Sequence, residues 1–220
     1  MKWQRFTIAC GILGPLIMIV GSLVAALPYE SKKGESYSPL NHFISELGEL
    51  GVSHNAHVFN LCLIAGGLML VGFMLGLGVF LATKLGYLAG AVGIWSGLSC
   101  SAVGMVPMNN LPVHMRVADS FFYSGLATTL LFTLAIVTDR GGKLSKWLAL
   151  PGSLTAICFS AFLALPHIRG IPRATALDPS KFVRPTVWVL PLLEWSVFAS
   201  IMIWVAAVTL ALALKRKPQL

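Results

Sequence analysis

Apolar residues run almost without interruption along this chain, and short polar stretches divide them into six segments. A helix needs about 20 apolar residues to cross the hydrocarbon core of a bilayer, and each segment is long enough to do so. The pattern predicts an all-α polytopic membrane protein, a helical bundle that forms a single domain over residues 1–220. The six predicted transmembrane helices cover residues 6–27, 55–81, 85–106, 117–137, 147–165 and 187–214.

The polar stretch 38–57, after the first helix, differs from a simple connecting loop. Its apolar positions Leu40, Phe43, Ile44 and Leu47 follow the i, i+3, i+4, i+7 spacing of a short amphipathic helix. We therefore predict an ordered amphipathic helix on the outer side of the membrane.

Residues around this stretch have the character of helix ends. Ser38 is a suitable N-cap, Pro39 suits the first helical position, and Gly48 is a suitable C-terminal stop. The opposite face of the helix would carry the polar side chains of His42, Ser45, Glu46 and Glu49.

Composition supports the membrane assignment and excludes other classes. The chain is 56% hydrophobic and 11% charged, with a mean hydropathy of +0.81, which excludes an ordinary soluble globule. Its net charge of +8 reflects lysine and arginine at membrane interfaces rather than nucleic-acid binding. The expected partner is the lipid bilayer, and the oligomeric state stays open.

The positive-inside bias places both termini in the cytoplasm of a multi-pass cell-membrane protein. In this orientation the inner side carries Lys2, Arg5, Lys84, Arg140, Lys143, Lys146, Lys215, Arg216 and Lys217. The outer side carries the other seven cations, and four of these lie in the connection 166–186. That connection is therefore the feature whose charge needs an explanation.

Small residues predict how the helices pack. Gly86, Gly90, Gly93 and Gly97 recur along the third predicted helix, and Gly72 and Gly76 along the second. This spacing lets helix backbones approach closely in membranes. We expect the third helix to lie at the centre of the bundle.

Histidine spacing raises the possibility of a metal site. His54 and His57 lie three residues apart, and Asn60 continues the same helical face. Two imidazoles could bind a divalent metal such as zinc if His114, Glu46, Asp119 or Glu194 supplied a third ligand. Headgroup contact is the alternative interpretation. The four cysteines show no metal-binding spacing.

Glu194 stands out because it lies inside an apolar segment, about 10 Å along the sixth predicted helix. An ionisable group within a membrane helix usually faces an interior site. Its alternative role is a buried partner for Arg184 or Arg116. Asp119 shares a helical face with Arg116 and is expected to pair with it before it has any catalytic role.

Two other clusters could bind a substrate. Ser45 next to Glu46, with His42 one turn earlier, suggests a nucleophile and base, although adjacent side chains point in different directions. The basic loop would cap the outer pocket and meet anionic headgroups or an anionic substrate. Its cations are Arg169, Arg173, Lys181 and Arg184.

Several of these residues carry a family resemblance. The segments Asn41–Gly48 and Gly104–Pro107, together with Asn60 and His114, resemble the six-helix membrane family known as domain of unknown function 998. Val106 and Pro107 stand where that family has Phe-Pro. The resemblance implies a six-helix topology with outward polar residues, singles out Ser45 and Glu46, and implies no reaction.

Two functions are compatible with this pattern. The first is a membrane-embedded enzyme, a hydrolase or cyclase, that acts on a lipid or isoprenoid entering sideways from the bilayer. Its candidate catalytic residues are Glu46, His57, His114 and Glu194, and its binding residues are Asn41, Ser45, Asn60, Asp119, Arg169, Arg173 and Arg184. The second is a non-catalytic protein that binds a lipid or another amphiphilic, anionic small molecule in the same pocket, or serves as a partner subunit.

Overall fold

The computed structural model describes residues 2–169 and 183–215. Within these ranges the protein is helical, and its only β-structure is an isolated bridge between Glu30 and Ser36. Six of the helices are long and apolar enough to cross a membrane, which confirms the predicted fold class. They are α1 (Lys2–Ala26), α2 (Ala56–Leu81), α3 (Lys84–Met105), α4 (Leu111–Thr138), α5 (Ala149–Ile168) and α6 (Val189–Leu214), with short 3-10 helices η1 (Ile44–Gly48), η2 (Met108–Asn110) and η3 (Lys146–Leu148).

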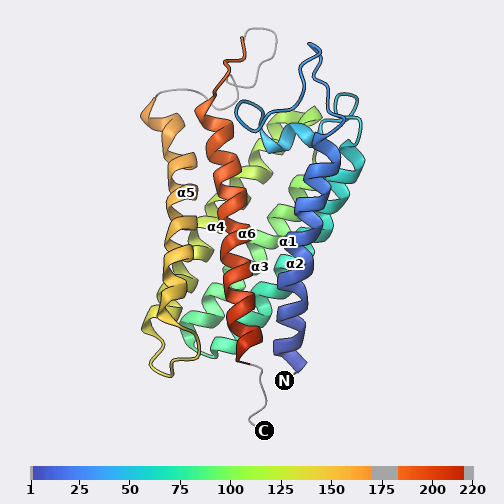
Figure 1. Cartoon of the computed structure of the whole chain (residues 1–220). Helices are drawn as coiled ribbons and strands as arrows, with labels where there is room; N and C mark the ends of the chain where they lie inside the picture. Colours follow the sequence, from blue (N-terminus) through green and yellow to red (C-terminus); the bar gives the residue numbers. More distant parts are fainter. Residues whose placement is uncertain (1, 170–182, 216–220) are drawn as a thin grey trace.

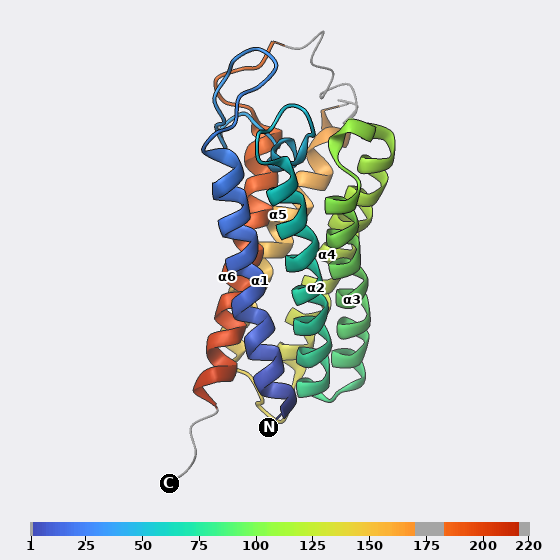
Figure 2. The ribbon, with the colours of Figure 1, turned by 90° about the vertical axis from the view of Figure 1, so that its right-hand side faces the viewer.

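The six long helices form a closed ring. Each packs against its neighbours in the chain, and α6 returns to pack against α1, as Figures 1 and 2 show. The N-terminal end of α1 and the C-terminal end of α6 lie at the same end of the bundle, which we call the basic end. The segment 27–55 covers the opposite end, which we call the cap end.

The expectation that the third helix is central was wrong. α3 packs mainly against α2 and α4 and lies on the ring like the other helices (Figure 2). Its glycines serve the contact with α2 alone. A Cβ on Gly97 would lie 2.9 Å from the backbone nitrogen of Val71 and 3.0 Å from the carbonyl oxygen of Gly67. Close backbone approach therefore explains the small residues, without a central position.

The start of α4 differs most from the sequence prediction. The fourth helix was predicted to begin at residue 117, yet α4 begins at Leu111 and η2 directly precedes it. Pro112 lies in that first turn, where its missing N–H removes no helical hydrogen bond. As a result His114 is carried into the bundle on a helix and is buried.

The short helix after α1 is present, but it is a 3-10 helix that begins at Ile44. Phe43 is its N-cap residue, so the predicted cap at Ser38 is not used. Leu40 is 48% exposed, and its carbonyl accepts the backbone N–H of Trp188 at 2.8 Å. The Leu40 carbonyl therefore bonds to the segment before α6 and not to a helical N–H within the cap.

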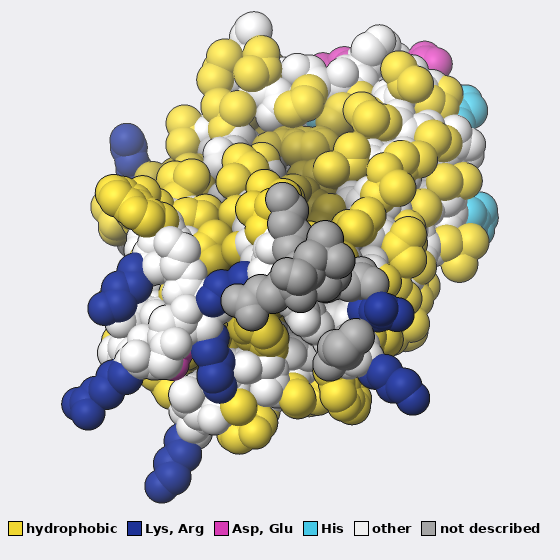
Figure 3. All heavy atoms as spheres, turned by 60° about the horizontal axis from the view of Figure 1, so that its bottom comes forward, with side chains coloured by type: hydrophobic (Ala, Val, Ile, Leu, Met, Phe, Trp, Pro, Cys, Tyr) yellow, Lys and Arg dark blue, Asp and Glu magenta, His cyan; other side chains and the backbone are white. Residues whose placement is uncertain are grey.

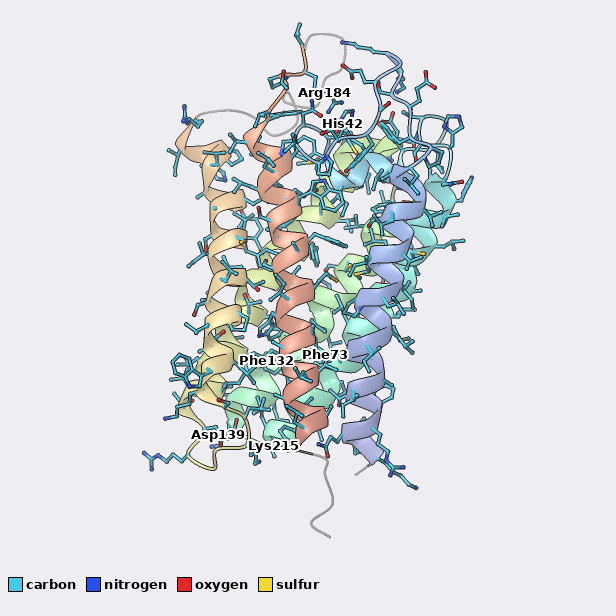
Figure 4. All side chains as sticks on the ribbon, in the orientation of Figure 1. His42, Phe73, Phe132, Asp139, Arg184 and Lys215 are labelled. Atoms are coloured by element: carbon cyan, nitrogen blue, oxygen red, sulfur yellow. The ribbon has the colours of Figure 1, made fainter. Side chains whose placement is uncertain are left out.

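Large aromatic side chains fill the ring near the basic end. Phe73, Phe132 and Trp204 are almost completely buried, and their rings meet with centroids 6.0 and 6.2 Å apart. Figure 4 labels Phe73 and Phe132 in this half of the bundle. A cavity of about 20 Å³ lies next to Trp204, and the larger free space inside the ring lies nearer the cap.

Charged residues also order the basic end. Asp139 accepts backbone N–H bonds from Gly141 at 3.1 Å and Lys143 at 2.7 Å. The Lys143 ammonium then donates to the carbonyl of Leu81 at 2.7 Å, which ties the α4–α5 turn to the end of α2. Lys215 lies close to Asp139 in Figure 4, and Figure 3 shows lysine and arginine gathered over this end.

We predict that Gly97→Ala destabilises the bundle by about 1–3 kcal/mol, because its methyl group would press on the backbone of α2. Ala91→Leu is the matched control, since Ala91 lies on the exposed face of the same helix. Thermal unfolding in detergent measures both variants. Equal melting temperatures for the two would contradict the close α2–α3 contact.

Candidate functional site

A buried ion pair between Glu46 and Arg184 holds η1 in place. Terminal guanidinium nitrogens of Arg184 donate to Oε1 of Glu46 at 3.1 Å and to Oε2 at 2.9 Å. Oε1 also accepts the Phe43 backbone N–H at 2.8 Å, and the Tyr29 hydroxyl lies 3.4 Å from Oε2. Because these contacts occupy the carboxylate, Glu46 acts as an anchor of the cap. Its catalytic role stays a prediction.

Arg184 connects the segment before α6 to the cap (Figure 4). Besides Glu46 it donates to the backbone carbonyl of Asn41 and lies 3.5 Å from a carboxylate oxygen of Glu35. The Asn41 side chain donates to the carbonyl of Pro185 at 3.0 Å. The structure therefore pairs Arg184 with cap carboxylates rather than with Glu194, and it places Asn41 in the same clamp.

The rest of η1 is bound to the bundle below it. Leu47 is completely buried among Ala25, Tyr29 and Phe59. The next residue, Gly48, lies against α2, and its carbonyl accepts a hydrogen bond from the Asn60 side-chain amide at 3.0 Å. Asn60, predicted as a binding residue, is thus a buried support of η1.

Glu194 reaches η1 from the opposite side. This carboxylate is 8% exposed, and its Oε2 accepts the backbone N–H of Ile44 at 2.7 Å. That donor is one of the N–H groups that a helix start leaves without an internal partner. Glu194 on α6 therefore fixes the first residue of η1 and faces an interior site, as its place in an apolar segment predicts.

Beneath η1 the ring encloses a cavity of about 70 Å³. Most of its wall is apolar, with Phe121 and Phe122 from α4 and Val197 and Phe198 from α6. Among the described residues, three polar side chains interrupt this wall: Ser45, His114 and Glu194. One residue each from η1, α4 and α6 thus meets at the cap side of an otherwise apolar space.

A smaller cavity of about 30 Å³ adjoins the first on the side of α4 and α5. It shares Ser45, His114 and Glu194 with the larger cavity and adds Asp119. Asp119, which the sequence predicts as a binding residue, therefore lines a space next to the larger cavity. Arg116, on the same helix, is exposed and donates to the carbonyl of Pro112 at 3.2 Å.

His114 has a defined tautomer. Its Nδ1 lies 2.7 Å from the carbonyl oxygen of Val106, and a carbonyl can only accept, so Nδ1 carries the proton. The other nitrogen, Nε2, then presents a lone pair, and it has no hydrogen-bond partner within the described ranges. His114 is thus a hydrogen-bond acceptor and a possible general base in the cavity wall.

The remaining predicted residues are not gathered at the cavity. His54 precedes α2 and His57 lies in its first turn, and both are exposed, whereas Asn60 is buried. In the part of the chain that the structure describes, no three metal-ligating side chains cluster. The metal site stays a prediction. Arg169 is exposed at the end of α5, and Arg173 lies outside the described residues.

His42 is buried within the cap, where its ring packs against the rings of Tyr29 and Tyr37. Its Nδ1 accepts the backbone N–H of Ser38 at 3.3 Å and lies 2.8 Å from Oδ1 of Asn41. Nε2 is buried without a partner. Burial lowers the pKa of His42 below its usual 6.5, although Glu46 opposes this shift.

Some residues of the site carry no recognisable sequence signal. Tyr29 and Tyr37 enclose His42, and Phe198 and Met18 line the cavity. In an apolar chain these side chains have the same appearance as lipid-facing or core residues. Only the assembled ring distinguishes them.

We predict that Arg184→Ala loosens the cap by about 3 kcal/mol, because it leaves the Glu46 carboxylate buried without its cation. Hydrogen exchange of the amides of residues 43–49 measures the effect. Lys32→Ala is the control, since Lys32 pairs with Glu49 at 2.7 Å on the exposed surface, where ion pairs contribute little. Equal effects of the two variants would show that the burial of the pair is irrelevant.

The cap should also loosen as pH falls. Because the folded-state pKa of His42 is depressed, the stability it contributes is present above pH 6.5 and is lost as the pH drops below that value. Lowering the pH from about 7.5 to 5.5 should therefore reduce amide protection in residues 38–49. His42→Gln should remove this pH dependence, and His54→Gln, at an exposed histidine, should retain it. Unchanged pH dependence in His42→Gln would contradict the assignment.

Comparison with known proteins agrees with this architecture. Residues 12–211 match the family described as "Protein of unknown function (DUF998)". No curated protein and no solved structure matches the chain. The match extends over most of the six-helix bundle. This protein is therefore an integral membrane protein that belongs to the DUF998 family.

Proposed function

We propose that this protein binds an amphiphile in the cavity under η1. The observation that carries the proposal is an apolar cavity inside a membrane bundle whose polar groups all lie at its cap side. Ligand sites are commonly apolar pockets in which a few placed polar groups fix orientation. The apolar body of the ligand would contact α4 and α6, and its polar end would face Ser45 and His114.

The polar groups indicate which ligand end would bind. His114 Nε2 offers a lone pair, and the Ser45 hydroxyl can donate or accept. A hydroxyl group satisfies both residues. The ligand class that fits is therefore a long-chain or isoprenoid alcohol, or a lipid with a free hydroxyl at its polar end.

In this proposal the cap faces the outside of the cell. The described basic residues gathered at the opposite end are Lys2, Arg5, Lys84, Arg140, Lys143, Lys146 and Lys215. Cytoplasmic ends of membrane helices carry such an excess of lysine and arginine. The amphiphile would then come from the outer leaflet.

One observation favours a second function, a hydrolase. Ser45, His114 and Glu194 line the same cavity. Serine and histidine serve as nucleophile and base in hydrolases, and here the Val106 carbonyl holds Nδ1 of His114 in place. Incubation with a long-chain alcohol ester separates the two functions. Release of the free alcohol, lost in Ser45→Ala, would favour the enzyme, whereas unchanged bound ester would favour binding alone.

To test binding, we would crosslink a diazirine-bearing C12 alcohol to the protein in nanodiscs and map the labelled peptides. We expect labels on α4 and α6 around the cavity, and we expect Ser45→Ala to weaken binding about fivefold, the effect of one lost hydrogen bond. Ala118→Phe should block labelling by filling the cavity. Leu154→Phe, at an exposed position on α5, is its control. Labelling of the lipid-facing surface alone would contradict the proposal.

A further inference from the structure

A groove of about 430 Å³ lies on the outer surface of the ring, between α1 and α6 and under the cap. Its wall is formed mainly by Ile19 and Leu23 of α1, Leu27 directly after α1, Tyr37 of the cap, and Trp195 and Phe198 of α6. Ile19 and Leu23 are exposed and belong to a membrane-spanning helix. The groove therefore faces lipid chains.

The seam between α1 and α6 is tight at one end and open at the other. Near the basic end Gly11 lies directly against Thr209, and the Gln4 amide donates to the carbonyl of Leu212 at 2.9 Å. Toward the cap the two helices diverge (Figure 1). There the Trp195 indole of α6 donates a hydrogen bond to the hydroxyl of Tyr37, a residue of the cap, at 3.0 Å. The groove occupies this divergence.

Phe198 is the residue shared by the groove and the inner cavity. Its side chain is half-buried, and its ring meets that of Trp195 edge to face, with centroids 5.5 Å apart. Phe198 therefore lies at the boundary between lipid-facing space and the cavity that Ser45 and His114 line. Rotation of a single partly exposed side chain is a fast motion and would join the two spaces.

The sizes of the two spaces agree with this arrangement. The inner cavity, about 70 Å³, is less than half the volume of a cavity of about 150 Å³ that holds benzene. It accommodates the polar end of an amphiphile and the first carbons of its chain. The outer groove is several times larger and can hold the rest of one hydrocarbon chain.

We infer that the groove between α1 and α6 is the route by which a lipid-like amphiphile reaches the cavity from the bilayer, and that Phe198 is its gate. The occupant of the groove is one hydrocarbon chain of that amphiphile. This inference rests on the proposed function, because it assigns the access route of the same cavity. It adds a specificity-determining residue, since the ring of Phe198 limits what can pass.

Cys100 provides a reporter inside the cavity, because its buried thiol lines the wall. With Cys10, Cys62 and Cys158 replaced by alanine, methyl methanethiosulfonate, which is small and uncharged, would be applied to the protein in nanodiscs. We expect Phe198→Ala to raise the rate of Cys100 modification severalfold and Phe198→Trp to lower it. Phe80→Ala removes a partly buried phenylalanine of α2 that lines neither space, and it should leave the rate unchanged.

The outcomes separate the gate from the ligand. Equal rates in Phe198→Ala, Phe198→Trp and the parent would overturn the gate, as would equally rapid modification by a charged sulfonatoethyl reagent, which would indicate access from water. This assay needs no native ligand. If the Phe198 variants alter the Cys100 rate but the C12 alcohol does not crosslink, the gate is supported and the proposed ligand is contradicted. If the C12 alcohol crosslinks but the Cys100 rate does not change, the ligand is supported and the gate is contradicted. Size-exclusion profiles and melting temperatures would confirm that each variant is folded.

Discussion

The ion pair between Glu46 and Arg184 is the constraint on which the candidate site depends. It joins residues 138 positions apart in the chain, and it buries the Glu46 carboxylate against a guanidinium that is 20% exposed. A buried ion pair often adds little net stability, because desolvation offsets the attraction between the charges. What it does here is fix one arrangement. η1 can occupy only a position where the Glu46 carboxylate meets the guanidinium, and this position places Ser45 over the cavity.

From that position the other polar contacts of the cap follow. The first N–H of η1 donates to Glu194, and the last carbonyl accepts from Asn60. The Glu194 carboxylate and the Asn60 amide, which would be costly in a membrane without partners, thus form hydrogen bonds with η1. Unsatisfied polar groups are expensive where water is absent. The Ile-Ser-Glu-Leu-Gly segment thus covers the cavity, and Ile44 and Ser45 of this segment line it.

Packing of the ring explains where the cavity lies. A ring of six helices leaves a space along its axis, and large side chains must fill it. Phe73, Phe132 and Trp204 fill the half near the basic end, where α1 and α6 also meet closely. Toward the cap these two helices diverge, and the interior there holds both free space and polar groups. The contacts near the basic end hold α1 and α6 together there, so the two helices can diverge toward the cap without separating.

Sequence reasoning found most members of the site but could not sort their roles. Ser45, His114 and Glu194 stand out because polar residues are costly near apolar segments, and all three line the cavity. Glu46 stands out for the same reason, yet it is an anchor. His54 and His57 have a spacing that suits a metal only if both lie on one helix, and α2 begins after His54. Local spacing cannot reveal which cation a carboxylate meets.

The sequence by itself determined the class of protein, the number of membrane helices and their approximate bounds. These properties depend on hydropathy and segment length, which are local and can be read along the chain. The tertiary structure alone decided that the helices close into a ring, that Arg184 selects Glu46, and that Phe198 lines both a lipid-facing groove and an inner cavity. Each of these depends on contacts between residues far apart in the chain, and hydrophobic residues look alike in sequence whether they face lipid, core or cavity.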